Sequence, residues 1–185
     1  MSLVTETVLW TIGHGNRSIG EFIGLLRVAG IERVVDVRAY PASRRHPQFG
    51  RESLARSVEE AGIRYAWEGK ALGGRRRPGK DSPHVALRNA GFRAYADHME
   101  SEDFREALDR LVESARAQRT AIMCAERLPW QCHRNLIADS LDVRSARVLH
   151  LVGTAQTLEH ARSRLARLEG QRLVYDAGGQ LALGI

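Results

Sequence analysis

The sequence predicts an α/β fold: a single-domain, three-layer sandwich in which a mostly parallel sheet carries helices on both faces. Short apolar segments of strand length recur along the chain, and amphipathic segments with a helical period separate them. Strands that alternate with helices favour a parallel sheet, because each crossover helix covers a face of it. A length of 185 residues suits one domain with a sizeable core, so we take 1–185 as a single α/β domain.

The first half of the chain follows this alternation closely. A buried strand leads into a glycine-bearing turn around His14, and Ser18 with Glu21 then has the capping-box pattern of a helix start. Gly30 stops that helix. The predicted elements are strands at 8–12, 33–38 and 63–67, and helices at 18–30 and 51–61.

The second half opens with an irregular excursion at 68–89, where glycine and proline break any regular structure. A strand at 120–124 leads into the segment that holds both cysteines. For the C-terminus (154–185) we expect a helix followed by a hairpin that turns at Gly178 and Gly179. The predicted elements are helices at 92–99, 102–118, 132–141 and 154–169, strands at 120–124 and 147–152, and hairpin strands at 172–175 and 180–183.

Bulk composition limits the functional classes. The chain carries 28 Lys and Arg against 22 Asp and Glu, and this arginine-rich excess of +6 favours anionic partners. No apolar run approaches the ~20 residues of a membrane span, and no secretory signal is recognisable. Two cysteines do not make a disulfide scaffold, so we expect a cytoplasmic protein with reduced thiols and no membrane partner.

Ligands bind such sheets at the carboxyl ends of the strands, where the loops after the first, second and fourth strands would share one rim. Two of these loops lead into helix N-termini, whose free N–H groups favour an anion. Arginine can grip a phosphate or carboxylate there. We expect the rim to bind an anion through Asn16, Arg17, Arg38, Ser43, Arg44 and Arg134, and to act on it through Glu126, Cys132, His14 and His133.

The two cysteines allow several interpretations. Cys124 at a strand end first suggests the oxyanion cradle of cysteine phosphatases and sulfurtransferases, but nine residues separate it from Arg134 and Pro129 offers no N–H. Cys132 is the preferred nucleophile, because a helix start, His133 and Arg134 should depress its pKa. Cys124 alternatively is a small buried hydrophobe. No cofactor is expected; a divalent metal at the cysteines and histidines is a weaker alternative.

Other residues have plainer interpretations beside functional ones. His14 either hydrogen-bonds within its loop or serves the site, and Asp36 is a candidate partner that orients Arg38. His150, inside an apolar strand, is expected to be a satisfied core histidine. The basic run at 75–77 is either a solvated face or a contact to nucleic acid.

Three motifs occur in order: Thr11 to Ser18, Val35 to Arg44, and Cys124 to Glu126 with Pro129 to Arg134. With these motifs, residues 8–152 resemble the DUF488 family, a set of mainly prokaryotic proteins of unknown function. The resemblance supports the fold and a three-motif site, and it implies no reaction.

Two functional hypotheses follow from these observations. The first is an enzyme, a hydrolase or transferase, that acts on a phosphate-bearing or otherwise anionic substrate such as a nucleotide or nucleic acid. The second is a non-catalytic module that binds nucleic acid through its basic loops. A thiol redox or metal-sensing protein is a third and weaker option.

Overall fold

The computed structural model describes residues 6–42, 44–77, 79–154 and 156–177. Six strands form one sheet in the order β3-β2-β4-β1-β5-β6, and a separate two-stranded hairpin pairs β7 with β8. The first five strands of that order run parallel, and β6 pairs antiparallel with β5. This is the mostly parallel α/β sheet that the alternation of elements predicts. In the described part of the chain, no helix has the length and apolarity needed to cross a bilayer.

Up to residue 153 the strands and helices lie close to their predicted positions, except that the segment 68–89, expected to be irregular throughout, begins with a short helix at 69–72. The sheet strands are β1 (Val8–Gly13), β2 (Arg33–Asp36), β3 (Arg64–Trp67), β4 (Thr120–Cys124), β5 (Arg147–Gly153) and β6 (Gln156–Glu159). The helices are α1 (Ile19–Val28), α2 (Arg51–Glu60), α3 (Gly69–Leu72), α4 (Ala90–His98), α5 (Glu102–Ala117) and α6 (Arg134–Val143), with 3-10 turns η1 (Pro47–Phe49) and η2 (Pro129–Gln131).

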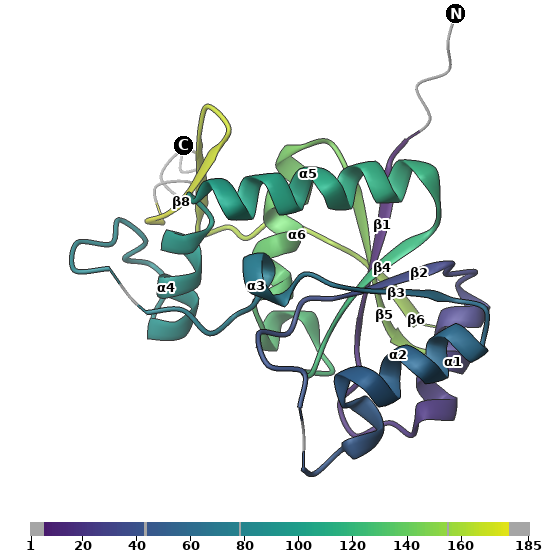
Figure 1. Cartoon of the computed structure of the whole chain (residues 1–185). Helices are drawn as coiled ribbons and strands as arrows, with labels where there is room; N and C mark the ends of the chain where they lie inside the picture. The colour runs from purple at the N-terminus through teal and green to yellow at the C-terminus, as the bar shows by residue number, and fades with distance from the viewer. Residues whose placement is uncertain (1–5, 43, 78, 155, 178–185) are drawn as a thin grey trace, which may run out of the picture.

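Helices cover both faces of the sheet, as Figure 1 shows. Alternate strand residues point to opposite faces, so Leu9 and Ile122 belong to the core under α5 and α6, whereas Trp10 and Met123 belong to the core under α1 and α2. The same alternation puts Cys124 on the α5 and α6 side of β4.

The start of α1 has the predicted capping box. The hydroxyl of Ser18 accepts from the backbone N–H of Glu21, and the Glu21 carboxylate accepts from the backbone N–H of Ser18 at 2.7 Å. The cap fixes where the chain turns from the loop after β1 into the helix.

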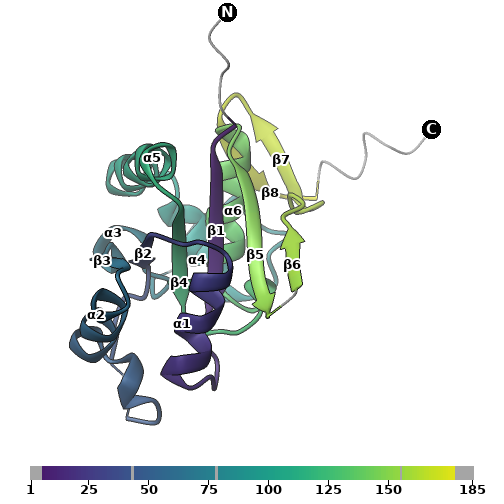
Figure 2. The same cartoon turned by 90° about the vertical axis from the view of Figure 1, so that its right-hand side faces the viewer.

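The C-terminal segment differs from the prediction. The expected helix at 154–169 is wrong: β6 pairs with the edge of β5, and β7 (Ala166–Glu169) forms a hairpin with β8 (Arg172–Tyr175). Figure 2 shows β6 beside β5 and the hairpin beyond it. A hairpin is present as predicted, but its turn lies between residues 169 and 172. The predicted partner strand 180–183 and the turn at Gly178 lie outside the described residues.

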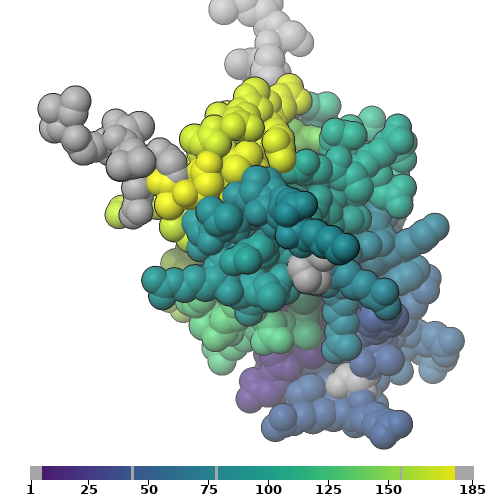
Figure 3. Space-filling view, turned by 90° about the vertical axis from the view of Figure 1, so that its left-hand side faces the viewer, coloured from purple at the N-terminus to yellow at the C-terminus, as the bar shows by residue number. Residues whose placement is uncertain are grey.

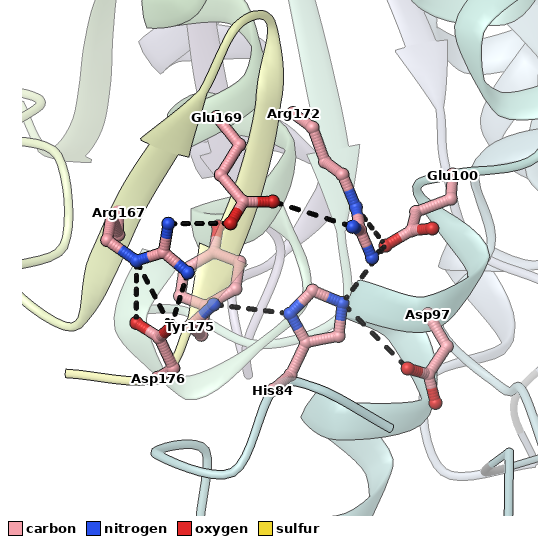
Figure 4. Close-up of polar contacts among 8 residues, drawn as sticks. All are labelled: His84, Asp97, Glu100, Arg167, Glu169, Arg172, Tyr175 and Asp176. Carbon is pink, nitrogen blue, oxygen red and sulfur yellow. Dashed lines mark hydrogen bonds and ion pairs between the residues drawn. The ribbon is translucent and has the colours of Figure 1, made fainter. Parts of the chain in front are cut away.

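The hairpin packs against the excursion at 68–89, which the sequence left irregular. The backbone N–H of Ala86 donates to the carbonyl of Tyr175 at 2.9 Å. In Figure 3 the teal segment that leads into α4 spreads across one face beside the yellow hairpin. In Figure 4 the buried His84 lies between this hairpin and the carboxylates of Asp97 and Glu100. The ion pair between Arg172 of β8 and Glu100, together with the hydrogen bonds of the Tyr175 backbone to Ala86 and His84, fastens the C-terminal hairpin to the body.

Candidate functional site

The carboxyl ends of β2, β4 and β1 meet at one edge of the sheet, as the sequence predicts. Gly13 at the end of β1 lies beside Cys124, and Asp36 at the end of β2 lies beside Met123. The backbone N–H of His14 donates to the carbonyl of Cys124 at 3.0 Å, which continues the pairing into the loops. Two sequence motifs from the first quarter of the chain and a third from beyond residue 120 thus share one rim.

A pocket of about 300 Å³ opens at this rim. It brings together four of the predicted site residues, Arg38, Glu126, Cys132 and His133, and adds Cys124. The pocket is lined by Arg38, Ala39, Tyr40, Gly74, Arg75, Asn89, Gly91, Phe92, Cys124, Ala125, Glu126, Gln131, Cys132 and His133.

The other predicted residues lie elsewhere. Asn16 and Arg17 line a second hollow near Arg127, and Arg44 lines a third near α2. Arg17 donates to two backbone carbonyls, those of Gly13 and Val152, so it ties β1 to β5. Ser43 lies outside the described residues.

His14 is buried and lies against η1. Its ring stacks on Phe49 with centroids 4.2 Å apart, and its Nδ1–H donates to the carbonyl of Gly15 at 2.8 Å. Burial lowers the pKa of His14 to about 4, with a smaller contribution from the charge of Arg38. A neutral His14 that fixes its own turn is therefore the state near pH 7, which matches the plainer of its two interpretations.

Arg38 reaches the pocket from β2 as half of a buried ion pair. Asp36 accepts from its Nε at 2.9 Å and from its Nη2 at 2.5 Å, and Tyr65 donates to the same carboxylate at 2.8 Å. Burial alone would lower the pKa of Arg38, but the hydrogen bonds and charge of Asp36 outweigh it and raise that pKa. Asp36 thus orients Arg38, as the sequence suggested, and keeps it cationic at the pocket wall.

The two thiols lie next to each other in the pocket wall. Hydrogen bonding from the Cys132 thiol, aided by Arg134 and by the backbone N–H groups of Ala125 and Glu126, lowers the pKa of Cys124 to about 7 despite its burial. The same pairing and burial raise the pKa of Cys132 well above its usual value. This is the reverse of the sequence expectation and favours Cys124 as the more acidic thiol of the pair, with Cys132 as its hydrogen-bond donor.

His133 stands behind the thiols as the residue before α6. Its Nε2 lies 3.0 Å from the carbonyl of Val37, and its Nδ1 lies 3.9 Å from the sulfur of Cys124. A carbonyl only accepts, so Nε2 carries the proton and Nδ1 offers a lone pair to the thiol side. Burial lowers the pKa of His133, which keeps the ring neutral.

Arg134 is buried under the pocket and does not line it. Its Nη2 donates to the carbonyl of Glu126 at 2.5 Å, its Nε donates to the sulfur of Cys132 at 3.2 Å, and its Nη1 donates to Thr11 at 3.2 Å. An added Cβ at Gly13 would lie 2.7 Å from Arg134 Nη2 and closer still to the Glu126 carbonyl. Because residue 13 is a glycine, the loop between the two cysteines (residues 125–131, the cysteine loop) can pack closely against the end of β1.

A buried hydrogen-bonded chain extends from Arg134 to the C-terminal hairpin. Thr11 bonds to His150 at 2.8 Å, His150 to His160 at 3.1 Å, and His160 to the carboxylate of Asp139 at 3.0 Å. Tyr175 of β8 donates to the same carboxylate at 2.8 Å. The chain confirms that His150 is a satisfied core histidine.

The sequence did not predict the other members of this hydrogen-bonded series. Its one available signal was Asp139, a charged residue among the apolar positions of a predicted helix. A donor and an acceptor can be assigned to each bond from Arg134 to Asp139, so these two buried side chains are joined through Thr11, His150 and His160.

Three of the pocket side chains could hold a metal ion. The two sulfurs and a ring nitrogen of His133 lie within 4.8 Å of one another. Glu126, by contrast, is exposed at the pocket edge, where its carboxylate could serve as an acid or base. The arrangement therefore offers thiol chemistry, anion binding and soft-metal binding at one rim.

The fold and the site together define a class of protein. It is an α/β protein with a mostly parallel sheet, and a pocket lined by cysteines and an arginine lies at the carboxyl ends of its strands. The family model described as "Domain of unknown function DUF488" matches residues 18–141. The chain belongs to the DUF488 family. A search of the curated proteins finds no significant match, and neither does a search of the solved structures.

Proposed function

We propose that this protein is an enzyme that binds a small anionic substrate in the pocket at the carboxyl ends of β2 and β4 and acts on it through the thiol of Cys124. One observation carries the proposal: a single pocket holds a cationic Arg38 fixed by Asp36, a vicinal pair of thiols and the rim carboxylate of Glu126. A fixed cation orients an anion, a thiol attacks an electrophile, and a carboxylate exchanges protons.

The anion is held by the cationic side of the pocket. Arg38 lies in the wall, and the exposed Arg75 stands over the ring of Tyr40 at the mouth, 5.8 Å from its centroid. The pocket also lies at the start of α6, where the helix dipole favours negative charge. Arg17, Arg134 and Arg44 take no direct part in this proposal, since the first two brace backbone carbonyls and the third lines another hollow.

Cys124 is the proposed nucleophile in place of Cys132. Its sulfur would attack an electrophilic atom of the bound anion, the leaving group would depart with a proton from Glu126, and water or a second acceptor would release the covalent intermediate. Such a course describes a hydrolase or a transferase. Cys132 would stabilise the Cys124 thiolate by its S–H bond, and His133 would stay a neutral neighbour.

The second candidate, a nucleic-acid-binding module, draws less support from the basic run at 75–77. Arg76 donates to the carbonyls of Gly73, Lys70 and Ala71, so it closes the end of α3. Arg75 and Arg77 are exposed, but a strip for phosphates needs several outward-facing cations in a row, and Arg76 between them is bound to the backbone.

A thermal-shift screen tests the proposed anion site. Wild type would be incubated with phosphorylated metabolites, nucleotides, oligonucleotides and small carboxylates in a phosphate-free buffer. We expect a small anion to raise the Tm of wild type. It should not raise the Tm of the double variant Asp36→Asn/Arg38→Gln, which removes the pair together and leaves no lone buried charge.

Arg127→Gln and Arg44→Gln are the matched controls, because they neutralise arginines at the other two hollows. Both should respond to the ligand as wild type does. A ligand whose effect survives in the double variant but disappears in either control would place the anion elsewhere and refute the proposal.

A further inference from the structure

We propose that Cys124, Cys132 and His133 form a binding site for a thiophilic divalent ion, Zn²⁺, in the wall of the pocket. The three candidate ligand atoms lie within 4.8 Å of one another, and all three side chains are buried at the pocket. The metal site goes beyond the proposed reaction and does not depend on it, whereas its regulatory effect, described below, rests on the proposed function. Two sulfurs and one imidazole are a set that zinc accepts and that Mg²⁺ and Ca²⁺ do not favour.

The orientation of His133 fits a ligand. Its Nε2–H donates to the carbonyl of Val37 at 3.0 Å, which leaves the lone pair of Nδ1 facing the thiols. Histidines that bind metals usually donate their second nitrogen to such a carbonyl, because that bond fixes both the tautomer and the ring orientation.

The distances also allow an ion to sit between the ligands. His133 Nδ1 and Cys124 Sγ are 3.9 Å apart. Zinc–nitrogen and zinc–sulfur bonds of about 2.0 and about 2.3 Å add to about 4.3 Å, so a zinc ion would bridge the pair with a bent angle. The sulfur of Cys132 would supply the third ligand. The pocket would leave a fourth position for water or an anion.

Two neighbours of the triad support the same site. The Nε of Arg134 donates to the sulfur of Cys132 at 3.2 Å, a bond that stabilises a thiolate ligand. Gly74 passes over the imidazole so closely that an added Cβ would lie 2.5 Å from His133 Nδ1. Glycine at 74 therefore lets the chain pack directly on the face of the ring, and a side chain there would displace the imidazole from the thiols.

Zinc at this triad would regulate the pocket. With both sulfurs bound to the ion, Cys124 would no longer be a free nucleophile. An anion that enters the pocket would bind to the open coordination position of the metal and would not react with the thiol. The metal-bound form is thus an inhibited form of the proposed enzyme. Arg38 is not among the ligands, so loss of the anion site and loss of the metal site are separable.

Co²⁺, a spectroscopic stand-in for Zn²⁺, tests the site in the full-length reduced protein. We expect one equivalent to produce thiolate-to-cobalt charge-transfer absorption. Cys124→Ser, His133→Asn and Gly74→Ala should each weaken Co²⁺ binding at least about tenfold. The matched control His98→Asn should keep the absorption, because His98 also bonds to a backbone carbonyl, that of Ala71, but lies outside the triad.

A second measurement needs no variant and covers the case in which a substitution prevents folding. One equivalent of Zn²⁺ should slow alkylation of the two cysteines in wild type at least about tenfold, and a chelator should restore the rate. Absence of both the charge-transfer band and the protection in reduced wild type would overturn the metal site. The double variant Asp36→Asn/Arg38→Gln should still bind Co²⁺ while it loses the anion.

Discussion

Arg134 shows how a single buried side chain organises this site. It is 1% exposed, and its guanidinium bonds to the hydroxyl of Thr11 in β1 and to a sulfur and a backbone carbonyl of the segment 126–132. A buried cation is costly unless its donors are satisfied. Arg134 therefore shapes the cysteine loop from beneath, and a role in direct contact with the substrate does not fit its position.

Replacement of Arg134 by methionine should lower the free energy of unfolding by about 2–4 kcal/mol, because it leaves the Glu126 carbonyl and the Thr11 hydroxyl without their donor. Urea denaturation of both proteins measures the difference. The exposed neighbour Arg127→Met is the control and should change stability by no more than about 0.5 kcal/mol. Equal losses in the two variants would show that Arg134 has no bracing role.

The residue scale also explains why the expected lowering of the Cys132 pKa is not found. Cys132, His133 and Arg134 are consecutive, and their charges were expected to act together on Cys132. At the start of α6, consecutive side chains point in different directions, so His133 turns its lone pair to Cys124. The backbone N–H groups that favour the Cys124 thiolate belong to a loop geometry that residue types do not encode.

Among the elements, α1 was predictable because its signals are local. Ser18 and Glu21 are three residues apart, and Gly30 at φ 64° ends the turn after the helix. The C-terminal segment was not predictable in this way. Leu158, Leu165 and Leu168 have helical spacing, but a long-range pairing with β5 and an Arg147–Glu159 ion pair hold residues 156–159 as an edge strand.

The capping box of α1 gives a test at this scale. Ser18→Ala should destabilise the protein by about 1 kcal/mol, because it leaves the N–H of Glu21 without its acceptor. Thermal or urea unfolding measures the loss. Ser57→Ala is a matched control, since its hydroxyl only bonds back to the carbonyl of Ser53 within α2 and alanine is the better helix former. A loss that is no larger for Ser18→Ala than for Ser57→Ala would contradict the capping role.

At the scale of the whole molecule, the parallel order β2-β4-β1 creates the site. The sequence predicted a mostly parallel sheet, and hence the shared rim, from alternation alone, but it did not predict this strand order. It did not predict how the rim divides: one pocket takes Arg38 and the thiols, while Asn16 and Arg44 fall in separate hollows. That division depends on where η1, α3 and the segment 73–92 pack, which long-range contacts decide.

The C-terminal hairpin adds a second long-range link. Residues 142–177 lie beyond the segment that the family model matches, yet Tyr175 and His160 complete the buried chain that ends on Asp139 of α6. The hairpin thus braces, through α6 and Thr11, the arginine that supports the cysteine loop. Local patterns could not reveal this link, because it joins residues up to 139 positions apart.

The central claim is that Cys124, from β4, is a reactive thiol placed beside the cation Arg38, from β2. The most direct measurement compares alkylation by the anionic reagent iodoacetate and the neutral reagent iodoacetamide in the reduced, metal-free protein, with the modified cysteine located by mass spectrometry. The claim predicts that Cys124 is modified before Cys132. It also predicts that iodoacetate is favoured relative to its behaviour with glutathione, and that Asp36→Asn/Arg38→Gln abolishes this preference. Modification of Cys132 first, or a reagent preference equal to that of glutathione, would contradict it.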